Sequence, residues 1–113
     1  MVKNKEGSLY MLTSKQRANL RGAANKMDTI LQVGKDGINH NLVRQVIDAL
    51  EARELIKIRV LETAPVTARE AAFQLAEDTD SESVQVIGTR FVIYRESEKL
   101  KNSTKRIDLS AAK

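Results

Sequence analysis

The segment Ile30-Leu31-Gln32-Val33-Gly34-Lys35-Asp36-Gly37-Ile38-Asn39 decides how the chain is organised. Its apolar start predicts a strand, and Asn39 is a good N-cap for the amphipathic helix that follows. The two glycines allow the backbone to approach a ligand closely, and a helix N-terminus offers unpaired N–H groups to anions. Lys35 adds a positive charge. The segment therefore predicts a strand, a loop and a helix, with the loop as a candidate phosphate site.

The same loop has a simpler interpretation. A pair of glycines separated by two residues is a weak signal, because ordinary strand-to-helix turns also use glycine. The carboxylate of Asp36 would also repel a phosphate if it pointed toward the ligand. The loop can bind a phosphate only if its backbone faces the ligand while Asp36 faces solvent or caps the loop locally.

The composition is that of a small soluble domain. A chain of 113 residues, 42% hydrophobic and 30% charged, is long enough to bury one core. The absence of cysteine excludes disulfides, thiolate zinc sites and cysteine nucleophiles. No apolar run approaches the roughly 18 residues of a membrane span, and the N-terminus lacks the apolar core of a signal peptide. We therefore expect a cytoplasmic protein with no membrane partner.

The positive charge is concentrated around the loop. The formal net charge is +4, but residues 1–60 contain 11 Lys/Arg and 6 Asp/Glu, a balance of +5, whereas residues 61–113 contain 8 and 9, a balance of −1. A polyanion site would produce such a distribution. The alternative is that many small proteins are mildly basic for solubility alone.

Hydrophobic periodicity predicts three helices. The first begins at Thr13, where Gln16 completes a capping box, and the last begins at Thr67, where Glu70 does the same. The middle helix follows Asn39 and carries an apolar stripe at helical spacing. Each helix therefore has its own start signal in the sequence.

Four strands complete the pattern. The first precedes the loop, and the second, residues 55–61, alternates apolar and basic side chains. Residues 84–87 and 90–94 flank Gly88-Thr89, whose leading glycine is typical of a type II′ hairpin. Right-handed crossovers should make the first three strands parallel and the fourth antiparallel. Because the second strand is polar on one side, helices should cover mainly one face, which predicts an α/β two-layer sandwich of order α-β-α-β-α-β-β with a four-stranded mixed sheet.

The first helix carries a candidate basic face. Arg17 and Arg21 lie four residues apart on one edge, and Lys15 lies on the other flank. Like charges at that spacing cost a few tenths of a kcal/mol, whereas a plain solvated helix more often alternates charge signs. The pattern weakly favours a binding face, which Arg44 in the second helix would extend.

Four segments, in order, resemble the CRM domain, whose name stands for chloroplast RNA splicing and ribosome maturation. The segments are Leu12-Thr13-Ser14-Lys15-Gln16-Arg17, Val33-Gly34-Lys35-Asp36-Gly37-Ile38, Glu54-Leu55-Ile56-Lys57-Ile58, and Val84-Gln85-Val86-Ile87-Gly88 followed by Val92-Ile93-Tyr94-Arg95. The bacterial single-domain members of this family are the YhbY-type RNA-binding proteins. The resemblance runs from about Leu12 to Arg95. It predicts an RNA-binding domain over residues 11–96, with residues 1–10 as an expected flexible leader and residues 97–113 as an expected polar, loosely ordered tail.

The resemblance implies a non-catalytic RNA-binding protein that associates with precursors of the large ribosomal subunit. It also implies a fold similar to the C-terminal domain of bacterial translation initiation factor three, and a glycine-x-x-glycine loop and basic first helix that contact ribosomal RNA. Together with the residue patterns, it identifies the candidate RNA-binding residues as Gly34, Lys35, Asp36, Gly37, Lys15, Arg17, Arg21 and Arg44.

Other functions have less support in the sequence. Aromatic residues make up 4% of the chain, so no stacking platform is predicted, and binding should depend on the RNA backbone and shape. The single histidine, His40, has no partner constellation for catalysis, so we expect no catalytic residue, metal, cofactor or small-molecule substrate. We expect a monomer. The alternative is a protein-interaction adaptor whose basic first helix docks an acidic partner.

Overall fold

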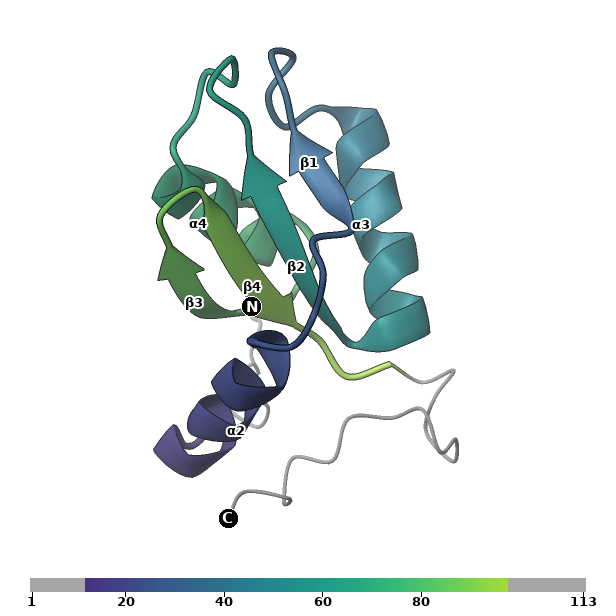
Figure 1. Ribbon diagram of the computed structural model, residues 1–113. Coiled ribbons are helices and arrows are strands. Elements are labelled where there is room, and N and C mark those ends of the chain that lie inside the picture. Colours follow the sequence, from purple (N-terminus) through teal and green to yellow (C-terminus); the bar gives the residue numbers. More distant parts are fainter. Residues whose placement is uncertain (1–11, 98–113) are drawn as a thin grey trace.

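The computed structural model describes residues 12–97, which form three helices and four strands (Figure 1). The elements are α2 (Ser14–Ala24), β1 (Leu31–Val33), α3 (His40–Arg53), β2 (Leu55–Val60), α4 (Ala68–Asp78), β3 (Glu82–Ile87) and β4 (Arg90–Tyr94). This order confirms the one expected from the sequence. The expected leader, residues 1–10, and the tail from residue 98 lie outside the described residues.

The sheet has the strand order β1-β2-β4-β3. β1 pairs with β2 in parallel, and β4 runs antiparallel to both β2 and β3. The first three strands are therefore parallel to one another and the fourth is antiparallel, as predicted. β4 lies between β2 and β3, so the chain returns through the middle of the sheet rather than along its edge.

Local signals set the element boundaries as expected. Thr13 and Thr67 form the two predicted capping boxes, and the Asn39 side chain accepts the N–H of Leu42 at 2.9 Å. Gly88 has φ of +60° while Thr89 keeps negative φ, which agrees with the predicted type II′ hairpin. These short-range interactions fix the start of each helix and the β3–β4 turn.

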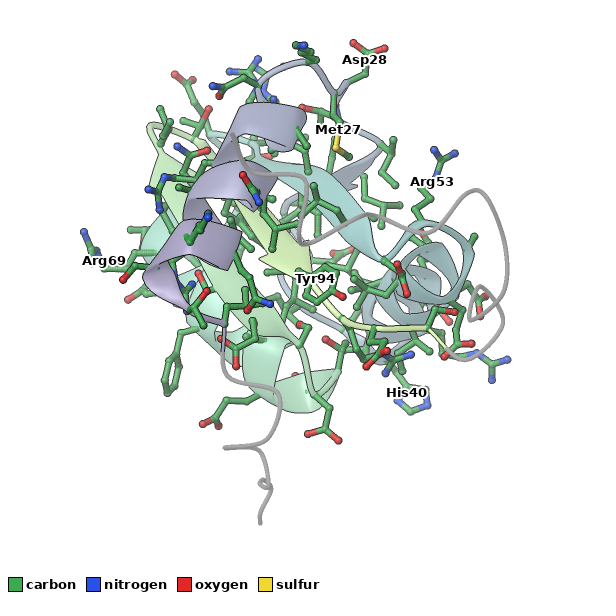
Figure 2. The ribbon with its side chains drawn as sticks, turned by 90° about the horizontal axis from the view of Figure 1, so that it is seen from below. Met27, Asp28, His40, Arg53, Arg69 and Tyr94 are labelled. Carbon is green, nitrogen blue, oxygen red and sulfur yellow. The ribbon has the colours of Figure 1, made fainter. Side chains whose placement is uncertain are left out.

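Helices cover both faces of the sheet, although unequally. α3 and α4 bury one face, where Ile56 and Ile58 join the larger core. α2 lies against the opposite face and packs on Leu55 and Tyr94 (Figure 1). Seen from below in Figure 2, α2 and Met27 lie on one side of the sheet and His40 on the other. The sequence predicted helices mainly on one face. The structure differs in that α2 covers part of the other face.

α2 packs on the second face of the sheet because one end of that face is apolar. β2 alternates, so Leu55 shares a face with the basic side chains of that strand, and β4 places Val92 and Tyr94 on the same face. Val84 of β3 joins them. These apolar side chains occupy one end of an otherwise polar face, and α2 covers that end with Leu20, which is fully buried.

Arg17 fastens α2 to the sheet. Its guanidinium lies 3.3 Å from the Glu82 carboxylate and also donates to the carbonyl oxygen of Ser83. Both side chains of the ion pair are about one-third exposed, 30% and 31%. The contact joins the first turn of α2 to the first residues of β3.

The segment after β4 is held against the end of α3. Glu54, the C-cap of α3, has φ of 67° and a fully buried side chain whose Oε2 accepts the Ser97 N–H at 2.7 Å. Ser97 Oγ donates to the Glu51 carbonyl at 2.6 Å, and the Arg95 guanidinium donates to Glu51 Oε2 at 2.6 Å. The packed domain therefore reaches Ser97, the first residue that the sequence analysis assigned to the tail. None of the helices within residues 12–97 is long and apolar enough to cross a membrane.

Replacing Leu20 with alanine tests whether α2 is an integral part of the fold. Leu20→Ala should lower the free energy of unfolding by about 2–5 kcal/mol, because it leaves a cavity between α2 and the sheet. Phe73→Ala on α4 is the control, since its side chain is 67% exposed and its loss should change stability by no more than about 0.5 kcal/mol. Urea unfolding measures both. Equal, small effects would mean that α2 is not docked on the sheet.

Candidate nucleic-acid interface

The loop between β1 and α3 is a closed turn at the edge of the sheet. The Gly37 N–H donates to the Gly34 carbonyl at 3.0 Å, and Lys35 and Asp36 form the exposed tip. The Leu61 N–H donates to the Val33 carbonyl at 2.9 Å, which fastens the start of the loop to the chain that leaves β2. One backbone hydrogen bond thus closes the turn, and another ties its start to the chain after β2.

The two glycines have different roles. Gly37 is buried with φ of +68°, and a Cβ at this position would lie 3.0 Å from Pro65 Cγ. A side chain here would be strained in conformation and crowded by the proline ring. Gly34 has no positive φ. A Cβ added at Gly34 would have Leu61 Cδ1 as its nearest neighbour, at 3.9 Å. Gly37 is therefore required by the turn itself, whereas Gly34 would tolerate a methyl group.

A polar depression lies beside the loop, with a volume of about 210 Å³. The loop forms one wall, and the other lining side chains are mostly amides: Gln32, Asn39, Asn41, Leu42 and Gln45. Amide groups both donate and accept hydrogen bonds, so they suit phosphate oxygens, ribose hydroxyls and base edges. The sequence analysis did not single out Gln32, Asn41 or Gln45, because only the fold brings β1 and α3 together around the loop.

The N-terminus of α3 borders this depression. Asn39 satisfies the Leu42 N–H with its side chain, and its carbonyl accepts the Val43 N–H at 3.1 Å. Of the four N–H groups that a helix start leaves without an intrahelical partner, those of Asn39, His40 and Asn41 remain once the Leu42 N–H is capped. A ligand in the depression would meet these groups and the loop together.

Asp36 is exposed beside Lys35 on the same rim. Within residues 12–97, the Asp36 carboxylate has neither an ion pair nor a side-chain hydrogen bond that would cap the loop locally. Of the two conditions set by the sequence analysis, exposure to solvent is met and local capping is not. The carboxylate is free to turn away from a ligand, but it still lowers the positive potential at the rim.

The basic residues of α2 do not surround the loop. α2 packs near Leu55, at the start of β2, whereas the loop follows Val33, which pairs with Val60 at the end of β2. Five residue steps along a strand correspond to about 17 Å. The two predicted parts of the site therefore lie toward opposite ends of the sheet, as Figure 1 shows for α2 and the β1–α3 loop.

The candidate basic side chains differ in their exposure and in whether they form an ion pair. Lys15 and Arg44 are exposed, and Arg21 is half-buried on α2. Arg17 is occupied by the ion pair with Glu82. Arg44 lies one turn into α3 and is not among the residues that line the depression beside the loop, and the basic residues of α2 form a separate group.

The site has the character of a binding surface. His40 is exposed in the first turn of α3 (Figure 2). The part of the chain that the structure describes holds no cluster of three or more His, Asp or Glu side chains that could bind a metal ion. The chemistry present is a flexible cation, amides and backbone N–H groups, which bind anions by hydrogen bonding and charge.

Known proteins are similar to this chain over the same region. Residues 12–95 match the CRS1 / YhbY (CRM) domain family. The chain is 44% identical over 91 residues to "Probable RNA-binding protein YqeI" of Bacillus subtilis (strain 168), covering 80% of this chain and 95% of that protein. It is 30% identical over 90 residues to "RNA-binding protein" of Haemophilus influenzae, covering 80% and 91%.

A solved structure has the same fold. The solution structure of the hypothetical protein SAV1595 from Staphylococcus aureus superposes with a TM-score of 0.67 at 52% sequence identity, covering 78% of this chain and 92% of that one. The agreement confirms the predicted α/β architecture with its four-stranded mixed sheet.

Alanine substitutions should distinguish the structural roles of Gly34 and Gly37. Gly37→Ala should lower the free energy of unfolding by about 1–3 kcal/mol, because alanine is strained at positive φ and its methyl group meets Pro65. Gly34→Ala should leave stability within about 0.5 kcal/mol of the wild type. Urea unfolding of the two variants makes the comparison. A larger loss for Gly34→Ala than for Gly37→Ala would contradict the loop geometry.

Proposed function

We propose that this chain, which belongs to the CRS1 / YhbY (CRM) domain family, is a non-catalytic RNA-binding protein. Two relatives that it matches over most of their length are named as RNA-binding proteins. The observation that carries the proposal is the Gly34–Gly37 turn, which lines the amide-rich depression and exposes Lys35 at its tip. We propose further that the RNA is ribosomal RNA in precursors of the large subunit and that the protein assists assembly, as its resemblance to YhbY-type proteins implies.

In this proposal the loop binds the sugar-phosphate backbone. Gly34 has no side chain to keep a phosphate away from the backbone, and the Lys35 ammonium supplies a charge-assisted hydrogen bond. The amides of Asn41 and Gln45 contact neighbouring oxygens or base edges. With few aromatic side chains for base stacking, affinity comes from phosphate neutralisation and RNA shape, so it should fall steeply with salt.

The remaining candidate residues extend the contact. Arg44, exposed one turn into α3, and Lys15 and Arg21 on α2 reach RNA that continues across the molecule. Arg17 contributes by holding α2 on the sheet through Glu82. The protein acts as a cytoplasmic monomer in this proposal and needs no cofactor.

Charge changes in the loop should move RNA affinity in opposite directions. Lys35→Glu should weaken binding of a fluorescein-labelled RNA hairpin by roughly tenfold, because it replaces an attraction by a repulsion. Asp36→Asn should strengthen binding by roughly two- to threefold, since it removes a negative charge that repels the RNA phosphates. Fluorescence anisotropy at about 0.1 M salt measures both.

The control is Arg53→Glu, which makes the same charge change as Lys35→Glu at the exposed end of α3 that is remote from the loop. It should have a much smaller effect on affinity. If Lys35→Glu and Arg53→Glu weaken binding equally, the loop is not the contact and only general charge matters. A wild-type protein that binds the hairpin weakly and with a shallow salt dependence would instead favour the adaptor that docks an acidic partner.

A further inference from the structure

Among residues 12–97, no helix covers one half of the second sheet face. α2 covers the end formed by Leu55 and Tyr94, whereas the other end, toward the β1–α3 loop, is exposed (Figure 1). Side chains that alternate with the buried ones on β2 and β4 point to this face. They are Lys57, Arg59 and Arg90, of which the two arginines are exposed.

The two arginines are direct cross-strand neighbours. Arg59 of β2 pairs in register with Arg90 of β4, and Gln32 of β1 pairs with Arg59 on its other side. Ile87 of β3 pairs with Arg90 and completes the row. A glutamine, two arginines and an isoleucine thus lie side by side across all four strands, with neighbouring strands about 5 Å apart.

Such a pair is unfavourable for the isolated protein. Like charges directly opposite each other on a sheet are destabilising. Within residues 12–97, the ion pairs of arginine are Arg17–Glu82 and Arg95–Glu51, and neither Arg59 nor Arg90 has an acidic partner. Two unneutralised guanidinium groups side by side on an open surface are suited to an anion that bridges them.

The pair also joins the two separated parts of the proposed interface. Gln32 belongs both to this row and to the lining of the depression beside the loop. On the other side, Lys57 lies two residues from Arg59 and pairs with Val92, which α2 covers. A continuous path of polar and basic groups therefore runs from the loop, across the open sheet face, to α2.

We propose that Arg59 and Arg90 form a phosphate-binding site of the RNA interface on the open sheet face, and that this site continues the contact from the Gly34–Gly37 loop toward α2. The inference rests on the proposed function, since it assumes that the ligand is RNA. The chemistry favours a polyanion over a protein surface, because the row is charged at its centre and has one exposed apolar side chain, Ile87, at its rim. Planar guanidinium groups bind phosphate oxygens in a bidentate manner.

The test uses three full-length variants with the same change of charge: Arg59→Gln, Arg90→Gln and the control Arg53→Gln. The probe is the labelled RNA hairpin, titrated by anisotropy over a range of salt concentrations. Arg59→Gln and Arg90→Gln should each weaken binding by roughly tenfold and lower the slope of log K against log salt by about 1. Arg53→Gln should change neither quantity beyond a small general effect.

Thermal unfolding shows whether a loss of RNA affinity comes from a lost contact or from a destabilised protein. Because each substitution removes one member of a repulsive pair, the unfolding midpoint of Arg59→Gln and of Arg90→Gln should equal or exceed that of the wild type. Wild-type affinity in both variants, with the loop variant Lys35→Glu still impaired, would overturn the sheet-face site and leave the proposed function standing. Absence of RNA binding by the wild type would overturn both.

Discussion

The pairing of β1 with the second half of β2 is the constraint on which the rest of the structure depends. Val33 lies opposite Val60, and its carbonyl accepts the Leu61 N–H at 2.9 Å. This pairing positions the glycine loop at the edge of the sheet, places Pro65 against Gly37, and brings Gln32 beside Arg59. A shift of one residue would turn Gln32 into the core and Val33 out of it, since strand side chains alternate.

Helices cover the two faces of the sheet to different extents. α3 and α4 cover one face to form the larger core, which supplies most of the hydrophobic driving force. The second face is apolar at one end, where α2 packs, and basic at the other. α2 therefore shields the apolar end without covering the arginines, and its ion pair from Arg17 to Glu82 holds it there.

Local features of the fold could be predicted from the sequence, and long-range ones could not. The capping boxes, the Asn39 cap and the Gly88 hairpin depend on residues within a few positions of each other, and the strand directions follow from crossover handedness. In contrast, the Arg17–Glu82 pair and the Arg59–Arg90 register join residues far apart in sequence. The different roles of Gly34 and Gly37 likewise depend on a contact with Pro65 that only the folded chain makes.

We propose that RNA meets one continuous surface formed by the loop and the open sheet face. The most direct measurement is ultraviolet crosslinking of the tagged protein in sedimented large-subunit precursor particles, followed by mass spectrometry of the crosslinked peptides. We expect crosslinks to ribosomal RNA in the peptides that contain Lys35, Arg59 and Arg90. Crosslinks concentrated on the outer surface of α4, around Phe73, or absence of the protein from every precursor fraction, would contradict it.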